Sequence, residues 1–445
     1  MEYSQRSAEK NTSDDALAGH HGATRRRQST VRSVIAGTIG NALESFDWSV
    51  YSSFAIFFGR HFFPAGDNAA STLSALAVFA VGFAMRPIGG WAIGTLSDLL
   101  GRRIALAVSI SMMSGSSLAI AILPTYETIG IAAPALLVFF RLVQGLSVGG
   151  EYAAAMTFVA ESAPPSRRGF LSSFVFFSTA LGVLGASALG WVLTRVLPQA
   201  AMASYGWRIP FLLGSVGALV GFWIRRGVDE TDAFREMRAR RSATGFRQSF
   251  ALLRDQRATL VKIVGMSLLG AVVFYLFTGY IPVYAVQRAG ARPVDAYAAS
   301  TIGLVVFTLM LPLFGYLSDR IGRRPQLIVF ALGFVLFAYP IVAATGASMG
   351  SILIVELLGL LLYGLYSSIA PAVMAELLPT EVRGVGIGTV YNSVAALLGG
   401  TTPYLMLWLQ SRHREQWFLG YVCVLAVISL LSFWSIPETR GRTLR

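Results

Sequence analysis

Long apolar runs, separated by short polar breaks, occupy the sequence from Val34 to Trp434. A helix of about 20 apolar residues crosses roughly 30 Å of hydrocarbon, so each run is long enough to span a membrane. The pattern predicts an all-α membrane protein whose twelve transmembrane helices form two six-helix bundles. The predicted spans are 33–59, 70–97, 104–123, 131–160, 169–197 and 208–225 in the first half, and 258–286, 297–318, 326–345, 350–377, 384–410 and 416–436 in the second.

The composition agrees with a membrane protein, because 54% of the 445 residues are hydrophobic and only 13% are charged. A net charge of +13 would suggest a nucleic-acid partner in a soluble protein, but here the arginines collect in alternate polar breaks. Those breaks lie at residues 25–27, 102–103, 167–168, 225–257, 320–324, 383 and 440–445. This positive-inside pattern predicts a multi-pass protein of the cell membrane with both termini in the cytoplasm and no nucleic-acid partner.

The polar segments set the expected domain boundaries. Residues 1–32 are polar and lack an apolar stretch behind a charged start, so they predict a disordered cytoplasmic tail and no signal peptide. The first bundle is expected at 33–225 and the second at 258–436. The charged segment 226–257 predicts a cytoplasmic linker at the membrane surface, and 437–445 a short cytoplasmic tail.

Two short stretches occur twice, about half the chain length apart. Residues 94–103, Gly-Thr-Leu-Ser-Asp-Leu-Leu-Gly-Arg-Arg, return as residues 315–324, Gly-Tyr-Leu-Ser-Asp-Arg-Ile-Gly-Arg-Arg. A second match relates residues 161–169 to residues 376–384 at nearly the same offset. Two matches in register indicate a duplicated unit, and in membrane transporters such units enclose a site between two moving halves.

The repeated stretch places Asp98 and Asp319 at the cytoplasmic ends of helices, where the helix dipole disfavours an anion. Nearby arginines, or the free N–H groups at the start of another helix, could compensate. The candidate helix starts lie near Gly384 for Asp98 and near Gly169 for Asp319. Such contacts would join the two halves and act as a latch on one conformation; alternatively, the carboxylates only cap a tight turn. The candidate latch residues are Asp98, Arg102, Arg103, Asp319, Arg323 and Arg324.

These motifs resemble a known family. Gly-x-x-x-Asp-x-x-Gly-Arg-Arg in both halves is similar to the signature loop of the major facilitator superfamily. Further stretches resemble its metabolite:proton symporter family, which carries organic acids and zwitterions such as proline and betaine: residues 40–47, 86–90, 141–152, 207–211 and 437–441. The resemblance implies the major facilitator fold, with a pseudo-two-fold axis along the membrane normal and a central cavity between the bundles.

Ionisable residues inside the predicted spans are expensive to bury and are functional candidates. They are Glu44, Asp47, Arg86, Arg141, Glu151 and Glu356. At about 1.5 Å per residue, Asp47 and Arg141 both fall near the middle of the membrane, so we expect them to pair.

Such a pair could couple an anion to a proton. If a substrate anion draws Arg141 away, Asp47 loses its partner and takes up a proton, so the two solutes enter together. The candidate proton-coupling residues are Asp47, Glu44, Arg141 and Glu151. A purely structural pair, which holds two helices in register, is the alternative.

The candidate substrate-binding residues come from both halves. They are Arg141, Gln144, Arg86, Tyr275, Tyr366 and Asn392. The two tyrosines lie on helices that would face the cavity if the superfamily arrangement holds, although aromatic residues at helical spacing can equally be packing. The four histidines fall in tails or outer loops and Cys423 is the single cysteine, so neither a metal site nor another cofactor is expected.

The sequence therefore predicts a transporter, not an enzyme. The leading hypothesis is import of a small organic anion, a mono- or dicarboxylate, with protons and driven by the proton gradient. A proton symporter of a zwitterion such as proline or betaine is the nearest alternative. A drug:proton antiporter would be expected to show a Gly-Pro-containing signature in its fifth helix. Residues 181–190 of that helix contain glycines but no proline, so this alternative is disfavoured. A receptor built on a transporter fold would need an output domain, and no such domain is evident.

Overall fold

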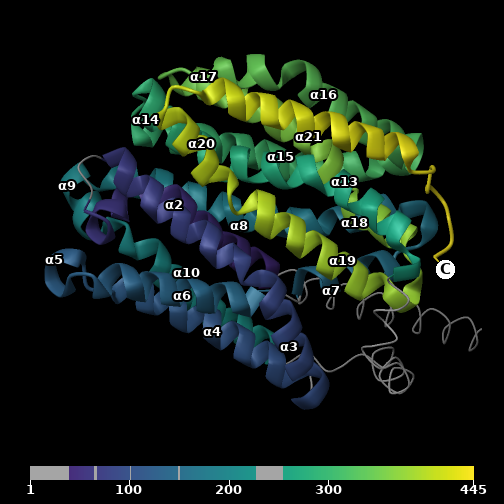
Figure 1. Ribbon diagram of the computed structural model, residues 1–445, viewed down its shortest axis with the longest axis horizontal. Helices are drawn as coiled ribbons and strands as arrows, with labels where there is room; N and C mark the ends of the chain where they lie inside the picture. The colour runs from purple at the N-terminus through teal and green to yellow at the C-terminus, as the bar shows by residue number, and fades with distance from the viewer. Residues whose placement is uncertain (1–39, 65–67, 101, 149–150, 227–253, 445) are drawn as a thin grey trace, which may run out of the picture.

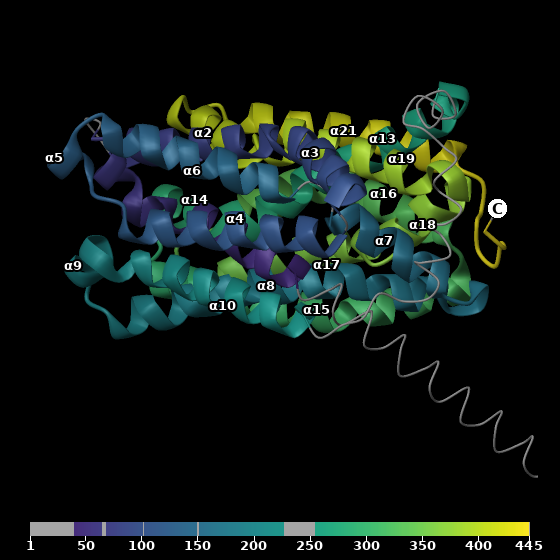
Figure 2. The same ribbon diagram turned by 90° about the horizontal axis from the view of Figure 1, so that it is seen from below.

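The computed structural model describes residues 40–64, 68–100, 102–148, 151–226 and 254–444. The expected tail 1–32 and most of the expected linker lie outside this part of the chain. Long helices run side by side in two groups, one from each half of the sequence (Figure 1). The view from below shows the same division, with the first half in front of the second (Figure 2).

The first half begins with a helix over residues 40–62. It continues with α2 (Asn68–Ala84), α3 (Arg86–Leu100), α4 (Arg102–Ile122), α5 (Tyr126–Ile129), α6 (Ala132–Val148), α7 (Glu151–Ser162), η1 (Pro165–Arg167), α8 (Arg168–Val196), α9 (Gln199–Ala201), η2 (Met202–Gly206) and α10 (Arg208–Arg226).

The second half consists of α13 (Arg257–Tyr275), η3 (Leu276–Tyr280), α14 (Ile281–Ala289), α15 (Pro293–Ile321), α16 (Arg323–Ala343), α17 (Met349–Ser367), α18 (Ala370–Leu377), α19 (Thr380–Val394), η4 (Ala395–Gly399), α20 (Thr402–Ser411) and α21 (Glu415–Ser435). With the segments on either side of each short break taken together, the described residues form twelve long helical segments, close to the predicted limits. Seven of these are long and apolar enough, by length and composition alone, to cross a membrane.

Prolines account for several breaks that hydropathy could not predict. Pro282 follows the π-helical turn η3, and Pro403 follows the π-helical turn η4. A proline ring clashes with the carbonyl four residues earlier, so the preceding turn widens. Pro371 is the second residue of α18, just after the break from α17, and Pro87 is the second residue of α3, which follows α2. Wide turns of this kind often lie beside functional sites.

The two halves meet along α8 and α15, which pack against each other. Close approach depends on small residues. A Cβ atom on Gly190 would lie 2.6 Å from the Tyr297 ring, and one on Gly182 would lie 2.0 Å from the Ala42 carbonyl oxygen. Larger side chains at these two positions would push α8 away from α15 and from the 40–62 helix.

The bundles also touch at both ends. The end where the C-terminal tail lies is called the tail end, and the end that carries α5, α9 and α14 the far end (Figure 1). At the far end, the Gln287 amide donates to Thr72 Oγ1 at 3.2 Å. Nearer the middle, the Tyr297 hydroxyl donates to the Ser53 carbonyl at 2.6 Å. At the tail end, the backbone N–H of Gly169 donates to Asp319 at 2.9 Å, so the two halves touch on both sides of their centre.

Candidate functional site

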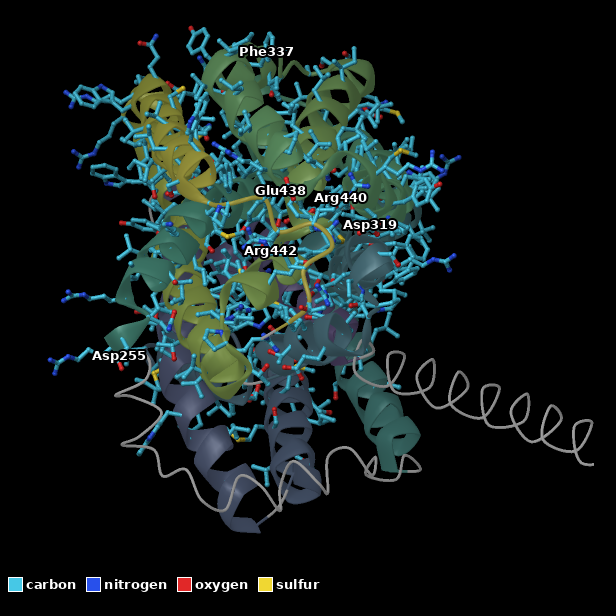
Figure 3. All side chains as sticks on the ribbon, turned by 90° about the vertical axis from the view of Figure 1, so that its right-hand side faces the viewer. Asp255, Asp319, Phe337, Glu438, Arg440 and Arg442 are labelled. Atoms are coloured by element: carbon cyan, nitrogen blue, oxygen red, sulfur yellow. The ribbon has the colours of Figure 1, made fainter. Side chains whose placement is uncertain are left out.

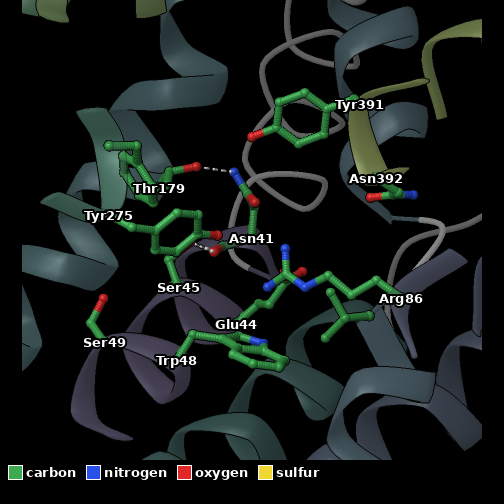
Figure 4. A pocket seen from close by; sticks show the side chains of 12 residues that line it. Asn41, Glu44, Ser45, Trp48, Ser49, Arg86, Thr179, Tyr275, Tyr391 and Asn392 are labelled. Atoms are coloured by element: carbon green, nitrogen blue, oxygen red, sulfur yellow. Dashed lines mark hydrogen bonds and ion pairs between the residues drawn. The ribbon is translucent and has the colours of Figure 1, made fainter. Parts of the chain in front are cut away.

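A small cavity of about 30 Å³ lies between the halves, with room for roughly two water molecules. Figure 4 shows the side chains around it. The first half contributes Asn41, Glu44, Ser45, Trp48, Ser49, Arg86, Val148 and Thr179. The second half contributes Phe274, Tyr275, Tyr391 and Asn392. Among the described lining residues, the charged groups belong to the first half, while the second half offers hydroxyl, amide and ring groups.

Arg86 is the arginine that reaches this cavity. Its Nη2 lies 3.3 Å from Glu44 Oε1, and both side chains are almost completely buried. The guanidinium carbon stacks 3.9 Å from the centre of the Phe83 ring and 4.5 Å from that of Trp48. Its Nε has no hydrogen-bond partner within the described residues. Arg86 therefore presents a buried cation with an unused donor beside the cavity.

The predicted pair of Asp47 and Arg141 is also present. Arg141 Nη1 lies 3.8 Å from Asp47 Oδ2, and both side chains are buried. Gln144 links the two, because its amide nitrogen donates to Asp47 at 2.8 Å and its oxygen accepts from Arg141 at 2.6 Å. Ser117 also donates to Asp47. This carboxylate thus accepts two hydrogen bonds, from Gln144 and Ser117, and has the Arg141 cation as its ion-pair partner, all within the first half.

Trp48 separates the two charge pairs. The guanidinium carbon of Arg141 lies 4.1 Å from the Trp48 ring centre, and Arg86 stacks on the same ring. Trp48 lines the cavity, whereas Arg141, Gln144 and Asp47 do not. Arg141 does not line the cavity in this conformation, because the indole and the bundle interior enclose its guanidinium, and its contact with substrate stays a prediction.

The 40–62 helix is fixed by Asn41, to which the sequence reasoning gave no role. Its amide nitrogen donates to Thr179 Oγ1 at 2.6 Å and to Ser178 Oγ and the Val175 carbonyl oxygen at 3.1 Å each. These bonds hold the helix against α8 at the level of Glu44. Ser117 was missed in the same way. A buried polar residue in an apolar run was the available signal in both cases.

Tyr275 and Asn392, both predicted, line the cavity from the second half. Tyr366 does not. Its ring stacks on Phe330 with centres 5.0 Å apart, and a Cβ atom on Gly270 would lie 2.2 Å from it. Tyr366 therefore packs inside the second bundle, because the rotation of α17 turns it away from the centre.

The contact predicted for Asp319 is present at the tail end. Its carboxylate accepts from the backbone N–H of Gly169 at 2.9 Å and of Phe170 at 2.8 Å, at the start of α8. Arg323 donates to it at 2.7 Å. Arg324 instead donates to the Trp434 carbonyl oxygen, within the second half. The side chains of Asp98, Arg102, Arg103 and Glu151 lie outside the described residues, so their expected contacts stay predictions.

The second repeated stretch forms crossed ion pairs between the halves. Arg168 of the first half lies 3.0 Å from Glu376 of the second, and Arg383 of the second lies 2.6 Å from Glu161 of the first. Arg323 also approaches Glu376 at 3.5 Å. Each copy of the repeat thus supplies one arginine and one glutamate to the other half. The sequence match was the signal for these pairs, but no partners could be assigned from it.

The C-terminal tail joins this network (Figure 3). The Thr439 hydroxyl donates to Glu376 at 2.6 Å, and Arg168 donates to the Arg442 carbonyl oxygen at 2.9 Å. Glu438 accepts from the first N–H groups of α16, those of Arg323 and Arg324. Partial burial raises the pKa of the Glu438 carboxyl, but backbone N–H groups outweigh this and hold it below its usual value. The hydrogen bonds between Glu438 and the start of α16 therefore weaken only as the pH falls through the acid range.

The model of the Major Facilitator Superfamily matches residues 37–403. The chain belongs to the major facilitator superfamily. This major facilitator protein is 40% identical to the alpha-ketoglutarate permease of Escherichia coli, over 92% of its own length and 93% of the permease. It is 34% identical to a citrate-proton symporter of Klebsiella pneumoniae (89% of each chain), and 32% identical to a proline/betaine transporter of Salmonella typhimurium (93% and 85%). These relatives confirm the resemblance to the metabolite:proton symporters.

The fold of this major facilitator protein matches solved structures of the superfamily. The crystal structure of a D-xylose-proton symporter superposes with a TM-score of 0.72 at 22% identity, covering 93% of this chain and 99% of the symporter. The predicted fold class, twelve helices in two bundles, is confirmed. The chain is a multi-pass membrane protein whose named relatives are transporters.

Proposed function

We propose that this protein imports a small organic anion, a mono- or dicarboxylate, together with protons by alternating access. The observation that carries the proposal is the pair of Arg86 and Glu44 at the cavity wall. The alpha-ketoglutarate permease and the citrate-proton symporter among the relatives support the same substrate class. The proton gradient is the proposed source of energy, and no cofactor is part of the proposal.

Arg86 is proposed as the group that receives the substrate carboxylate. A guanidinium presents planar, paired donors that match the two oxygens of a carboxylate. The Nε of Arg86 is buried and without a partner in the described residues, so a carboxylate that reached it would gain a charge-assisted hydrogen bond. Tyr275 and Asn392 line the same cavity from the second half and could bind the remaining oxygens of an organic acid.

Glu44 is proposed as the group that takes up the proton. It lines the cavity, whereas Asp47 lies behind Trp48 with two hydrogen-bond donors and the Arg141 cation of its own. A substrate carboxylate on Arg86 removes the counter-charge that keeps Glu44 ionised, so protonation of Glu44 follows. Anion and proton then enter together, because each removes an unfavourable charge left by the other. The Asp47 and Arg141 pair supports the site from behind.

Entry of a substrate requires the halves to separate, since a cavity of about 30 Å³ is too small for a carboxylic acid. The tail end carries the arginine-rich breaks, so we place it in the cytoplasm with both termini. The Asp319 contact and the crossed pairs are the latch proposed on that side. Their rupture would open the cavity inward, and loss of the far-end contacts would open it outward.

A direct test of the latch removes Glu376, which contacts both Arg168 and Arg323. Glu376→Gln leaves two buried guanidinium groups without this carboxylate, so the inward-open population is expected to rise at least about tenfold. The measurement is maleimide labelling of Ser173→Cys, a buried position at the α8–α15 contact, in a Cys423→Ser background.

Glu415→Gln is the matched control for that labelling. It removes a similar glutamate–arginine pair, that of Glu415 with Arg288, but at the far end and on the surface. Its labelling rate should equal that of the parent. Equal rates for Glu376→Gln and Glu415→Gln would contradict the latch.

The proposed function is tested by uptake into proteoliposomes. We expect alpha-ketoglutarate or another small carboxylate to accumulate when the outside is made acidic, with the membrane potential held at zero. A panel of mono-, di- and tricarboxylates, proline and betaine defines the class. Carboxylate uptake that ignores the pH gradient, or the absence of any carboxylate uptake, would overturn the proposal.

Zwitterion transport is the second candidate, supported by the proline/betaine transporter among the relatives. Quaternary ammonium groups are bound on open aromatic faces. Here the guanidinium groups of Arg86 and Arg141 both lie over the Trp48 ring beside the cavity. The site therefore favours an anion over a zwitterion. Saturable uptake of betaine, together with no uptake of any carboxylate, would make zwitterion transport the preferred function.

A further inference from the structure

Glu356 is a buried carboxyl group that the proposed mechanism does not use. It lies on α17 in the second bundle, and its exposed fraction is 0%. Ser300 on α15 donates to its Oε1 at 2.5 Å. The other oxygen, Oε2, has no hydrogen-bond partner within the described residues. The group is therefore buried with only one of its two oxygens satisfied.

The helices around Glu356 bring no cation to it in the described part of the chain. On α15, besides Ser300, Gly303 packs against it, since an added Cβ atom there would lie 3.0 Å from the Glu356 Cβ. The charged and phenolic groups on the neighbouring helices make their contacts with other residues. On α13, η3 and α14 the pairs are Lys262 with Ser435, Tyr275 with Phe83, Tyr280 with Gln410, Tyr284 with Tyr280, and Arg288 with Glu415. On α15 and α16 they are Asp295 with Arg292, Tyr297 with Ser53, Tyr316 with Arg320, Asp319 with Arg323, and Arg324 with Trp434, while Tyr339 is half exposed. On α17 itself, Tyr363 and Tyr366 pack on Phe330.

A carboxylate without a counter-charge in such a setting is strongly disfavoured, so the neutral acid is the form that this environment accepts. A neutral carboxyl group also fits the contacts. The Ser300 hydroxyl donates to one oxygen, and the proton can reside on the other. In the closed conformation Glu356 would then carry a proton that water cannot reach.

The position of Ser300 connects this proton to the transport motion. Its neighbours on α15 contact the first bundle: the Tyr297 hydroxyl donates to the Ser53 carbonyl oxygen, and Thr301 Oγ1 lies 3.1 Å from Ser187 Oγ on α8. Glu356 is therefore one helix behind the surface along which the two bundles must move. Movement of α15 would change both the Ser300 bond and the access of water to the carboxyl group.

We propose that Glu356 is a second proton-binding site of the transport cycle. It binds a proton from one side of the membrane, holds it while the bundles are closed, and releases it to water on the other side. Only a proton is gained and lost, at a carboxylate oxygen. The inference rests on the proposed function and extends it: the protein carries one proton at Glu356 in addition to the proton at Glu44, which balances the charge of a dicarboxylate.

The test is the accumulation ratio in proteoliposomes with the membrane potential held at zero. For a gradient of one pH unit, each coupled proton contributes about a factor of ten to the ratio. Glu356→Gln keeps the size of the side chain but binds no proton. We expect it to exchange substrate and to lower the accumulation ratio about tenfold.

A second variant and a control keep the test decisive. Glu356→Met also lacks a titratable group and needs no hydrogen bond, so it should give the same tenfold loss if the glutamine variant does not fold. Glu356→Asp retains a carboxyl group and should keep the parental ratio. Equal ratios in the parent and in either folded neutral variant would overturn the inference. The parent protein tests the proposed function separately. If a pH gradient does not change the distribution of substrate across the membrane in the parent, the proposed function is rejected, whatever the role of Glu356.

Discussion

Replacement of Arg86 by lysine is expected to raise the KM for a carboxylate substrate by about 10- to 100-fold. Lysine keeps the positive charge and can still pair with Glu44, but it lacks the planar fork and the buried Nε donor that has no partner in the described residues. A lost charge-assisted hydrogen bond costs roughly 1.5–3 kcal/mol, which corresponds to that range. Arg86→Met should abolish uptake. The measurement is the concentration dependence of the initial uptake rate in proteoliposomes.

The matched control is Arg412→Lys. Arg412 also stacks on a tryptophan, with its guanidinium carbon 4.6 Å from the centre of the Trp408 ring, but it is exposed at the far end. Its replacement should leave the KM unchanged. If Arg86→Lys retains the parental KM, Arg86 does not receive the substrate. If the KM increases only in Arg141→Lys, then Arg141 is the residue that receives the substrate carboxylate.

Glu44→Gln is expected to separate proton coupling from substrate binding. The amide can still occupy the space beside Arg86, so substrate exchange between the two sides should continue. The variant binds no proton, however, and the accumulation ratio should fall about tenfold for each pH unit of gradient. Counterflow of labelled substrate and accumulation under a pH gradient measure the two properties separately. Glu127→Gln, on the exposed helix α5, is the control and should match the parent.

Asp47→Asn should behave differently from Glu44→Gln, and this contrast shows which carboxyl group takes up the proton. Arg141 is fully buried with Asp47 as its carboxylate partner, so the variant leaves a charge without compensation. Breaking such a pair costs roughly 3–5 kcal/mol, and both exchange and accumulation should be lost along with thermal stability. If Glu44→Gln accumulates substrate normally, and Asp47→Asn is stable but does not couple uptake to the pH gradient, then Asp47 is the group that takes up the proton.

The helices of this protein were predictable because their signal is local. A span needs about 20 apolar residues wherever it lies, and the polar breaks mark its limits. The structure ends α8 at Val196 and α21 at Ser435, each within one residue of the predicted limit. The breaks at Pro282, Pro371 and Pro403 inside these runs were not predicted, because hydropathy does not register the loss of one backbone hydrogen bond.

Parts of the site were predictable for a similar reason. The depth of Asp47 and Arg141 follows from the rise of a helix, and two opposite charges at the same depth have a strong reason to pair. Asp319 was placed at the start of α8 because an anion at a helix C-terminus needs a donor from elsewhere, and the repeat suggested where to look.

The sequence by itself thus determined the number and limits of the spans, the duplication, and the set of buried charges, since each depends on composition, period or spacing along the chain. Only the tertiary structure decided which charge faces the cavity. Trp48 shields Arg141 and leaves Arg86 exposed to the cavity, while Tyr366 turns onto Phe330 and Glu356 is left without a cation in the described residues. These outcomes depend on the rotation of each helix about its axis, and that rotation is set by packing between residues far apart in the sequence.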